Sequence, residues 1–385
     1  MSNSRTVLIL GGGVGGLVTA NTLRKLLPKA DQIIIIDRER NHLFQPSLLW
    51  VMIGDRRPEK ISRPLARLNR KGIEFVCGDI EKINPEEKTV SVSGRTLKGD
   101  ALVISLGVEL APATIPGLVE AGQTFYTLKG AEAIREELAH FKGGRVVILT
   151  ATPMYKCPAA PYEAAMLIEY ACRRRGLRQK TKIDLYAAEP GPMGTAGPEV
   201  SVAVRQMVLS RGIQYHPNHQ VTQVDPQIRR ISFADGTSAD YDLLFFVPPH
   251  RPPKVVMEAG LVGETGWVSV DRQTLETRFK NVYAIGDVTT IPLKMGKPLP
   301  KAGVFAEGQA KVVAHNLASD WTGKGKTQCF DGFGECFIEI GDHRAGIGSG
   351  NFYAEPTPQV KIKPPGLRWH LAKIWFEQYW LRKVL

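Results

Sequence analysis

The feature that most constrains the fold is a glycine-rich run placed directly after a short apolar strand. The segment TVLIL at Thr6–Leu10 is followed by GGGVGG and then by a helical pattern over Val14–Leu27. In a G-x-G-x-x-G frame the glycines permit a tight turn, let the backbone approach a pyrophosphate, and let the helix pack closely on the strand. Phosphates then lie at the N-terminus of the helix, where free N–H groups and the helix dipole favour anions. The frame is filled here by Gly11, Gly13 and Gly16.

A second apolar run supports this interpretation. Ile33–Ile36 ends at Asp37, which lies 21 residues after Gly16. In dinucleotide-binding folds a carboxylate at about this spacing binds a ribose hydroxyl. The order of strand, glycines, helix, strand and acid therefore predicts a dinucleotide-binding domain at the start of the chain.

Two later segments indicate which dinucleotide is bound. Leu102–Gly107 reads as a strand and a glycine turn, and Asn281–Asp287 (NVYAIGD) reads as a strand ending in Gly286 and Asp287, ahead of a helical pattern over Ala302–Ala318. In this order they resemble the FAD-binding elements of the two-dinucleotide-domain flavoprotein disulfide reductases. The resemblance implies FAD, with the Asp287 carboxylate on its ribityl chain. It also implies an α/β fold of two Rossmann-like domains, the second inserted in the first.

The second domain lacks the expected glycines. Its opening strand is present at Arg145–Leu149, but the following TATPMYKCPAAPYEAA contains no glycine before the helical pattern over Tyr162–Arg174. Without glycine the backbone cannot approach a pyrophosphate closely. We therefore expect that the second domain does not bind a nicotinamide nucleotide.

Three separated motifs narrow the resemblance. They are Lys156–Glu163 (KCPAAPYE), Pro300–Gly303 (PKAG) and Phe330–Gly341 (FDGFGECFIEIG). They resemble segments of the sulfide:quinone oxidoreductases and of the flavoprotein subunit of flavocytochrome c sulfide dehydrogenase. The resemblance implies a redox pair, Cys157 and Cys336, beside the flavin. It also implies that Lys301 lies near flavin N1 and the C2 carbonyl, and that Gly303, with Glu307–Ala310 (EGQA) after it, belongs to the segment whose helix points at the flavin pyrimidine.

Thiol–disulfide exchange explains why such an enzyme needs two cysteines. Hydrosulfide attacks the disulfide, one cysteine keeps a persulfide, and the other becomes a thiolate that can reduce the flavin. Glu163 is the candidate general base, although an exposed glutamate in the first turn of a helix is the equally plain alternative. We expect Cys77 and Cys172 to be core residues and treat Cys329 as a candidate sulfur acceptor.

Two departures from the family shape the cofactor prediction. Phe125–Leu128, just after the domain crossover, lacks the third cysteine of many sulfide:quinone oxidoreductases. Phe44–Ser47 lacks the early cysteine through which flavocytochrome flavoproteins attach FAD. We therefore expect non-covalent FAD. None of the eight histidines has a partner at metal-ligand spacing, so no metal site is predicted.

The last segment, LRWHLAKIWFEQYWLRKVL after Pro364–Gly366, is predicted to be an amphipathic helix. Its aliphatic face is expected to dock on the protein, and a second, aromatic face is expected to contact membrane headgroups with Lys373 and Lys383 beside it. A dimer contact or a closing helix packed on both sides is the alternative. The first face, which is mainly aliphatic, comprises Leu367, Leu371, Ile374, Trp375, Leu381 and Leu385. The aromatic face comprises Trp369, Phe376 and Trp380.

The partners follow from charge and hydropathy patterning. The net charge of +12 is spread along the chain without a zinc-finger or helix-turn-helix signature, so no nucleic-acid partner is expected. No apolar run approaches the ~20 residues that span a bilayer, and the polar start of the chain leaves no expected signal peptide. A homo-oligomer is compatible with the sequence.

The sequence therefore predicts an FAD enzyme, peripheral to the cytoplasmic membrane, that oxidises sulfide to zero-valent sulfur or polysulfide and reduces a quinone. A flavocytochrome-type sulfide dehydrogenase, a type II NADH:quinone oxidoreductase and a non-catalytic flavin redox sensor are the alternatives. The expected domains are two parts of an FAD-binding domain (1–112 and 246–325), a second Rossmann-like domain (113–245) and a C-terminal segment (326–385).

Overall fold

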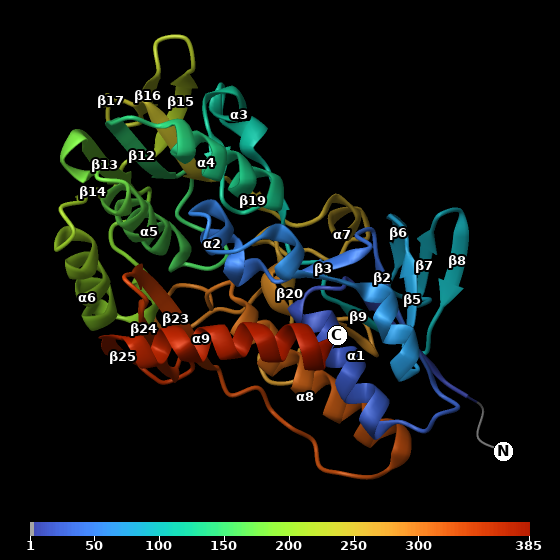
Figure 1. Cartoon of the computed structure of the whole chain (residues 1–385). Coiled ribbons are helices and arrows are strands. Elements are labelled where there is room, and N and C mark those ends of the chain that lie inside the picture. Colours follow the sequence, from blue (N-terminus) through green and yellow to red (C-terminus); the bar gives the residue numbers. More distant parts are fainter. Residues whose placement is uncertain (1–3) are drawn as a thin grey trace.

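The computed structural model describes residues 4–385 and contains two five-stranded parallel sheets (Figure 1). The first sheet has the order β21-β9-β1-β2-β5, and all its neighbouring strands are parallel. Its strands are β1 (Thr6–Leu10), β2 (Gln32–Asp37), β5 (Glu74–Cys77), β9 (Ala101–Ile104) and β21 (Val282–Ala284).

Strand β1 is apolar throughout because both faces of this sheet are covered. Val7 and Ile9 belong to one buried cluster, whereas Leu8 and Leu10 belong to another on the opposite face. Helices on both faces are the usual reason for continuous apolar runs in parallel strands. On one face α1 (Val14–Leu26) packs against α8 (Gly303–Thr322).

The second sheet is inserted between β9 and β21 and has the order β11-β18-β12-β13-β14. The predicted fold of two Rossmann-like units, one within the other, is confirmed. The strand β18 crosses the predicted boundary at 245. The strands are β11 (Gln123–Thr124), β12 (Gly144–Thr150), β13 (Thr181–Tyr186), β14 (Gln214–His216) and β18 (Leu243–Val247), and the helices are α4 (Leu128–His140), α5 (Ala160–Arg174) and α6 (Pro198–Leu209).

Smaller elements complete the two units. An antiparallel three-stranded sheet extends each of them, β6 (Ile80–Asn84), β7 (Thr89–Val92) and β8 (Arg95–Lys98) in the first and β15 (Val221–Asp225), β16 (Arg230–Phe233) and β17 (Ser238–Asp240) in the second. The short strand β3 (Asn41–Leu43) pairs with β4 (Ser62–Pro64), and the short helices are α2 (Leu48–Met52), α3 (Leu118–Ala121) and α7 (Lys254–Glu258).

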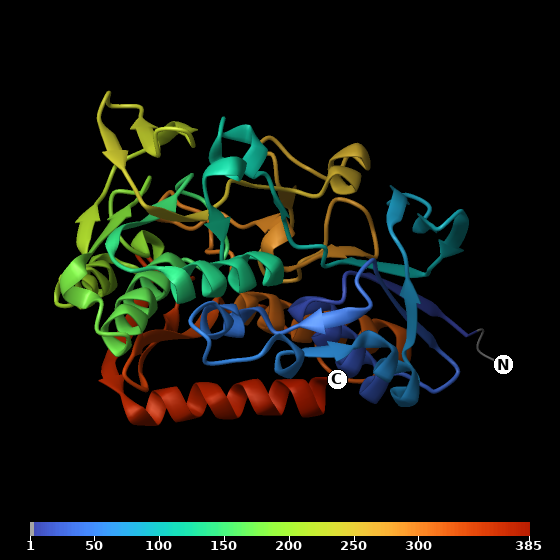
Figure 2. The same ribbon diagram turned by 45° about the horizontal axis from the view of Figure 1, so that its top comes forward.

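The C-terminal part joins the two units. It forms an antiparallel sheet of β23 (Phe333–Gly341), β24 (Arg344–Asn351) and β25 (Gln359–Gly366), followed by α9 (Leu367–Tyr379) and one π-helical turn over Trp380–Val384. Figure 2 shows α9 along one edge of the molecule, with the C-terminus beside α1. No helix within residues 4–385 is long and apolar enough to cross a membrane.

Candidate functional site

The glycine loop between β1 and α1 has the shape that a pyrophosphate requires. Gly11 has φ +103°, and a Cβ on Gly16 would lie 1.9 Å from the carbonyl oxygen of Gly11, so neither position tolerates a side chain. A Cβ on Gly13 would meet nothing within 4 Å, so the backbone there faces open space. No side chain caps the N-terminus of α1, and its first N–H groups are available to an anion.

Asp37, at the end of β2, holds this loop. Its Oδ2 accepts a hydrogen bond from the Gly12 N–H at 2.5 Å, and its Oδ1 accepts one from the Glu39 N–H at 2.8 Å. The carboxylate thus lies beside the glycine loop, in the position predicted for a ribose ligand. The contact with ribose itself stays a prediction.

Asp287 carries the observation that best fits a bound flavin cofactor. Gly286 adopts φ +73° after β21, and this turn buries Oδ1 of Asp287 without a hydrogen-bond partner in residues 4–385. Burial raises the pKa of this carboxyl group. A buried acceptor without a donor costs about 1–3 kcal/mol, so a ligand hydroxyl at this point would remove a real penalty. The residues predicted to hold FAD stay a prediction, namely Gly11, Gly13, Gly16, Asp37, Gly107, Gly286, Asp287, Lys301 and Gly303.

Lys301 places a buried cation in the same region. Its Nζ donates to the carbonyl oxygens of Asp287 at 2.7 Å and Thr289 at 2.8 Å, and it lies 3.5 Å from the centre of the Trp267 ring. Burial lowers its pKa to about 8. Trp267 was not foreseen from the sequence, because its link to Lys301 exists only in the folded chain.

Cys157 and Cys336 belong to neighbouring elements that are far apart in the sequence, because α5, which follows the Cys157 loop, packs on β23, which carries Cys336. Cys157 stands in the loop before α5 with φ +52°, and its N–H donates to the carbonyl oxygen of Lys301 at 2.7 Å. Cys336 lies on β23, and both residues are free thiols in this structure. Burial, and next the neighbouring Cys336, raises the pKa of the Cys157 thiol. Burial raises the pKa of Cys336 to about 12.

Glu163 lies beside both cysteines and is buried, so the alternative of an exposed first-turn glutamate is wrong. Its Oε1 accepts hydrogen bonds from the Glu339 N–H at 2.8 Å and from Lys373 Nζ at 3.2 Å. Burial raises the pKa of Glu163, and the ammonium of Lys373 opposes that shift. Proton exchange between this carboxylate and a thiol stays a prediction.

The C-terminal helix is oriented differently from the prediction. Trp380, expected to face lipid, is 2% exposed, and Phe376 packs edge-on against Phe44 at a ring separation of 5.6 Å. Lys373, expected at the surface, is buried against Glu163. The exposed side chains belong mainly to the face that was expected to dock, namely Leu367, Leu371 and Trp375, together with Tyr379.

The buried face of the helix was predicted wrongly because the sequence has two apolar faces and does not show which of them finds a partner in the folded chain. A regular 100° spacing also fails after Tyr379, where the helix widens into the π turn over Trp380–Val384 and turns Leu381 and Leu385 inward. Lys373 could not be identified as buried, since its partner Glu163 lies 210 residues earlier.

The remaining cysteines separate by burial. Cys172 is buried on α5, as predicted. Cys77 is exposed, so its expected place in the core is wrong: it ends β5, the edge strand of the first sheet. Cys329 is exposed as well. Within residues 4–385 no cluster of three or more potential ligands could hold a metal ion.

In the second unit, the loop that would face a nucleotide is filled by the protein itself. Glu189, just after β13, is buried and accepts hydrogen bonds from the hydroxyl groups of Thr150 at 2.7 Å, Tyr162 at 2.7 Å and Tyr155. Both tyrosines flank Cys157 in the sequence and are almost fully buried. This cluster occupies the end of β12 where a glycine turn is expected.

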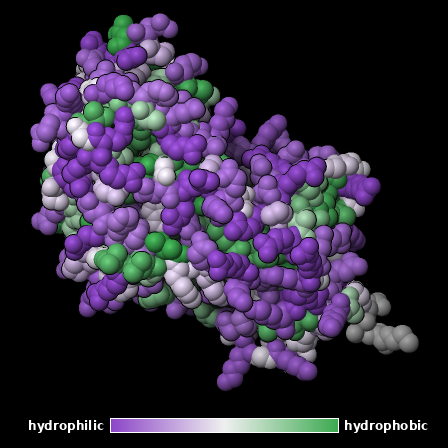
Figure 3. Space-filling model, in the orientation of Figure 1, coloured by the Kyte–Doolittle hydropathy of each residue, from purple (hydrophilic) through white to green (hydrophobic). Residues whose placement is uncertain are grey.

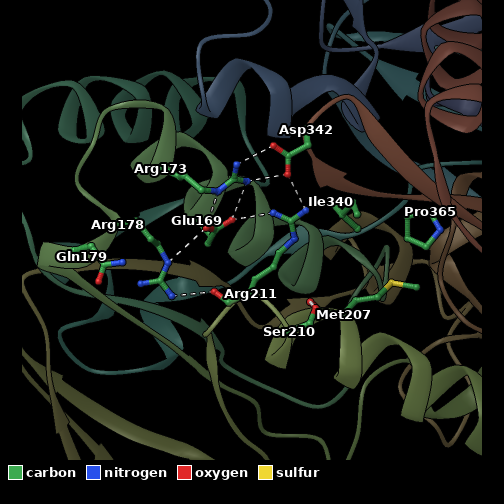
Figure 4. Close-up of a pocket in the computed structure, with 10 residues that line it drawn as sticks. All are labelled: Glu169, Arg173, Arg178, Gln179, Met207, Ser210, Arg211, Ile340, Asp342 and Pro365. Atoms are coloured by element: carbon green, nitrogen blue, oxygen red, sulfur yellow. Dashed lines mark hydrogen bonds and ion pairs between the residues drawn. The ribbon is translucent and has the colours of Figure 1, made fainter.

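A separate pocket shows how the hairpin bearing Cys336 is held on α5 (Figure 4). Asp342, in the β23–β24 turn, pairs with Arg173 at 2.8 Å and Arg211 at 3.2 Å, and both arginines also pair with the buried Glu169. The guanidinium groups are therefore already engaged with carboxylates. The ion pairs that line this pocket connect the hairpin to α5 through Arg173 and to the chain after α6 through Arg211.

Comparisons with known proteins agree with this geometry. Residues 5–310 match the family model of the pyridine nucleotide-disulphide oxidoreductases. The chain is 30% identical to the sulfide-quinone reductase of Aquifex aeolicus, over 99% of this chain and 91% of that protein. It is 24% identical to the mitochondrial sulfide:quinone oxidoreductase of Mus musculus, over 92% and 80% of the two chains. The crystal structure of the Aquifex aeolicus sulfide:quinone oxidoreductase superposes with a TM-score of 0.88 at 28% identity, covering 99% and 91% of the two chains.

Proposed function

Because the chain belongs to the pyridine nucleotide-disulphide oxidoreductases and, within them, to the sulfide-quinone reductases, we propose that it oxidises sulfide through Cys157 and Cys336 and reduces a quinone. The observation that supports the proposal is the packing of α5, which follows Cys157, on β23, which carries Cys336, with the buried Glu163 joining the two elements. FAD, when bound, supplies a two-electron acceptor between the cysteines and the quinone.

The cysteine chemistry balances in two steps. Hydrosulfide attacks one sulfur of the Cys157–Cys336 disulfide, the S–S bond breaks, and one cysteine becomes a persulfide while the other leaves as a thiolate. The thiolate now carries the two electrons that hydrosulfide brought. When this electron pair departs, the S–S bond forms again, and sulfur in the zero-valent state and a proton are released.

In this exchange Lys373 stabilises the negative charge of the thiolate, and Glu163 accepts a proton. Burial raises the pKa of both thiols, so an uncompensated thiolate is unfavourable at the site. The ammonium of Lys373 acts in the opposite direction on both pKa values and favours the leaving thiolate. Glu163 accepts the proton of the attacking hydrosulfide or of a thiol.

The exposed side of α9 is the proposed membrane contact. Leu367, Leu371, Trp375 and Tyr379 repeat every four residues and are 56%, 54%, 66% and 46% exposed. We call this row the α9 stripe. In the view of Figure 3 the surface is mainly hydrophilic, with hydrophobic residues in small groups. An apolar helix face flanked by the exposed Arg368, Arg382 and Lys383 suits an anionic lipid surface, where a membrane quinone is available.

The decisive experiment replaces each cysteine with serine and follows the flavin spectrum during anaerobic sulfide addition. Cys157→Ser and Cys336→Ser are expected to keep FAD and to lose sulfide-dependent bleaching, since each supplies one sulfur of the attacked bond. Cys77→Ser is the matched control and should bleach normally. If both single variants bleach at the wild-type rate, the disulfide mechanism is wrong. If Cys157→Ser and Cys329→Ser lose the reaction while Cys336→Ser keeps it, Cys329 is the second redox cysteine.

The membrane contact is tested by flotation with anionic lipid vesicles. The double variant Leu371→Ser/Trp375→Ser should lose most vesicle binding and retain bleaching by sulfide, because both side chains face outward, away from Lys373. Val202→Ser, at a 55% exposed position on α6, is the control for surface hydrophobicity. Undiminished vesicle binding by the double variant would exclude the α9 stripe, and a change from dimer to monomer would make it a subunit contact.

A further inference from the structure

The C-terminal segment reaches the glycine loop through a single histidine. The indole N–H of Trp380 donates to Nε2 of His42 at 2.9 Å, and Nδ1 of His42 lies 2.9 Å from the carbonyl oxygen of Gly12. Because a carbonyl oxygen only accepts, Nδ1 carries the proton and Nε2 is left free to accept from Trp380. The bond from Trp380 requires the neutral ring, because a protonated Nε2 cannot accept, and burial lowers the pKa of His42.

Both the N–H group and the carbonyl oxygen of Gly12 are therefore hydrogen-bonded to side chains. Its N–H donates to Asp37, and its carbonyl oxygen accepts from His42. Gly12 lies between Gly11 and Gly13, the two residues that form the pyrophosphate turn. A shift of His42 would consequently be transmitted directly to that turn.

A second set of contacts reaches the helix that would receive the phosphates. The carbonyl oxygen of Val384 accepts hydrogen bonds from Asn21 Nδ2 on α1 and from Lys71 Nζ, both at 3.0 Å. Lys71 Nζ also donates to Asn21 Oδ1 at 3.0 Å. Leu381 and Leu385 are 1% and 4% exposed, so the end of the chain is firmly packed on the first unit. Figures 1 and 2 both show the C-terminus beside α1.

We propose that the C-terminal segment Trp380–Leu385 is a structural part of the FAD site, in which Trp380 acts through His42 as a positioning residue for the glycine loop. Docking of this segment and binding of FAD are then coupled, and each stabilises the other. The inference rests on the FAD-binding part of the proposed function and is independent of the sulfide and quinone reactions.

The test compares two identical substitutions on one helix. Trp380→Phe removes the indole N–H and retains an aromatic ring against Phe44, whereas Trp375→Phe changes a 66% exposed side chain. In the holoenzyme without sulfide, we measure FAD release by the rise in flavin fluorescence. Trp380→Phe should release FAD roughly 2- to 10-fold faster, the range for one buried hydrogen bond, and Trp375→Phe should match wild type.

Two further measurements separate positioning from general loosening. Amide exchange should rise in Trp380→Phe for peptides covering Gly11–Leu17 and stay unchanged in the second sheet. His42→Phe should accelerate FAD release at least as much, and the double variant should add little, because both substitutions break the same chain of bonds. Wild-type FAD release in Trp380→Phe, or full additivity in the double variant, would overturn the proposal. Loss of sulfide bleaching with normal FAD release would instead concern only the redox pair.

Discussion

The two Rossmann-like units of this chain begin alike and diverge at one loop. Both run from a buried strand through a loop into a helix and a second strand, followed by an acidic residue, Asp37 in the first unit and Glu189 in the second. In the first unit the loop is rich in glycine, Asp37 accepts hydrogen bonds from backbone N–H groups, and no side chain caps the N-terminus of α1. In the second unit the loop is longer, and Glu189 is surrounded by hydroxyl groups of the protein itself.

This difference shows how one framework can serve two chemistries. An open loop accepts the phosphates of a cofactor. We expect a loop filled by Tyr155 and Tyr162 not to accept them, and both tyrosines, bonded to Glu189, support the cysteine between them. Cys157 accordingly has φ +52°, a backbone conformation that a non-glycine residue keeps only when its surroundings hold it there. The loop of the second unit that corresponds to the glycine loop thus carries Cys157.

The largest expected effect is the loss of FAD when the first loop is closed. A Cβ at residue 16 would overlap the Gly11 carbonyl oxygen, so Gly16→Ala should lower both thermal stability and FAD content. A Cβ at residue 13 meets no protein atom within 4 Å, so Gly13→Ala should fold normally and still bind FAD poorly. Absorbance of bound flavin and thermal unfolding of both variants are measured together. Full FAD content in Gly13→Ala would show that the pyrophosphate does not lie at this turn.

The two loops also differ in how much of their structure could be predicted from the sequence. The strand, glycines, helix and Asp37 of the first unit were predictable, because the pattern is local and each residue has a backbone reason to be there. For the loop of the second unit, the sequence predicted only that glycine is missing and did not predict which side chains fill it. Its carboxylate Glu189 finds partners that no spacing rule connects to it. The pairing of Cys157 with Cys336 came from a resemblance, since 179 residues separate them.

The C-terminal helix shows where such reasoning stops. Its helical character follows from the sequence, but the direction of its faces depends on partners elsewhere in the chain. Lys373 is buried because it bonds to Glu163. Trp380 is buried because it donates to His42 and packs against Phe44. Removal of Leu367–Leu385 would take Lys373 away from Glu163 and Trp380 away from His42, so we expect it to impair bleaching by sulfide as well as membrane binding.

An intermediate effect is expected at the pair that links the cysteine loop to this helix. Lys373→Met leaves the buried Glu163 without its cation, and breaking such a pair costs about 3–5 kcal/mol of unfolding free energy. Glu163→Gln together with Lys373→Met removes both charges and should recover part of this loss. Chemical denaturation of the two single variants and the double variant measures the coupling. Strict additivity of the three values would mean that the two charges do not stabilise each other in the folded protein.

The smallest expected effect concerns the filled loop itself. Tyr155→Phe removes one of three hydroxyl donors from Glu189 and should cost about 1–3 kcal/mol of stability, the penalty for an incompletely satisfied buried group. It should not create a nucleotide site, because the chain from Ala151 to Ala159 still lacks glycine. NADH at millimolar concentration should therefore bleach the flavin of neither wild type nor Tyr155→Phe at a rate comparable to sulfide. Rapid bleaching of the wild type by NADH would show that the second unit still binds a nicotinamide nucleotide. Rapid bleaching of the variant alone would show that the tyrosine hydroxyl, and not the missing glycine, closes the site.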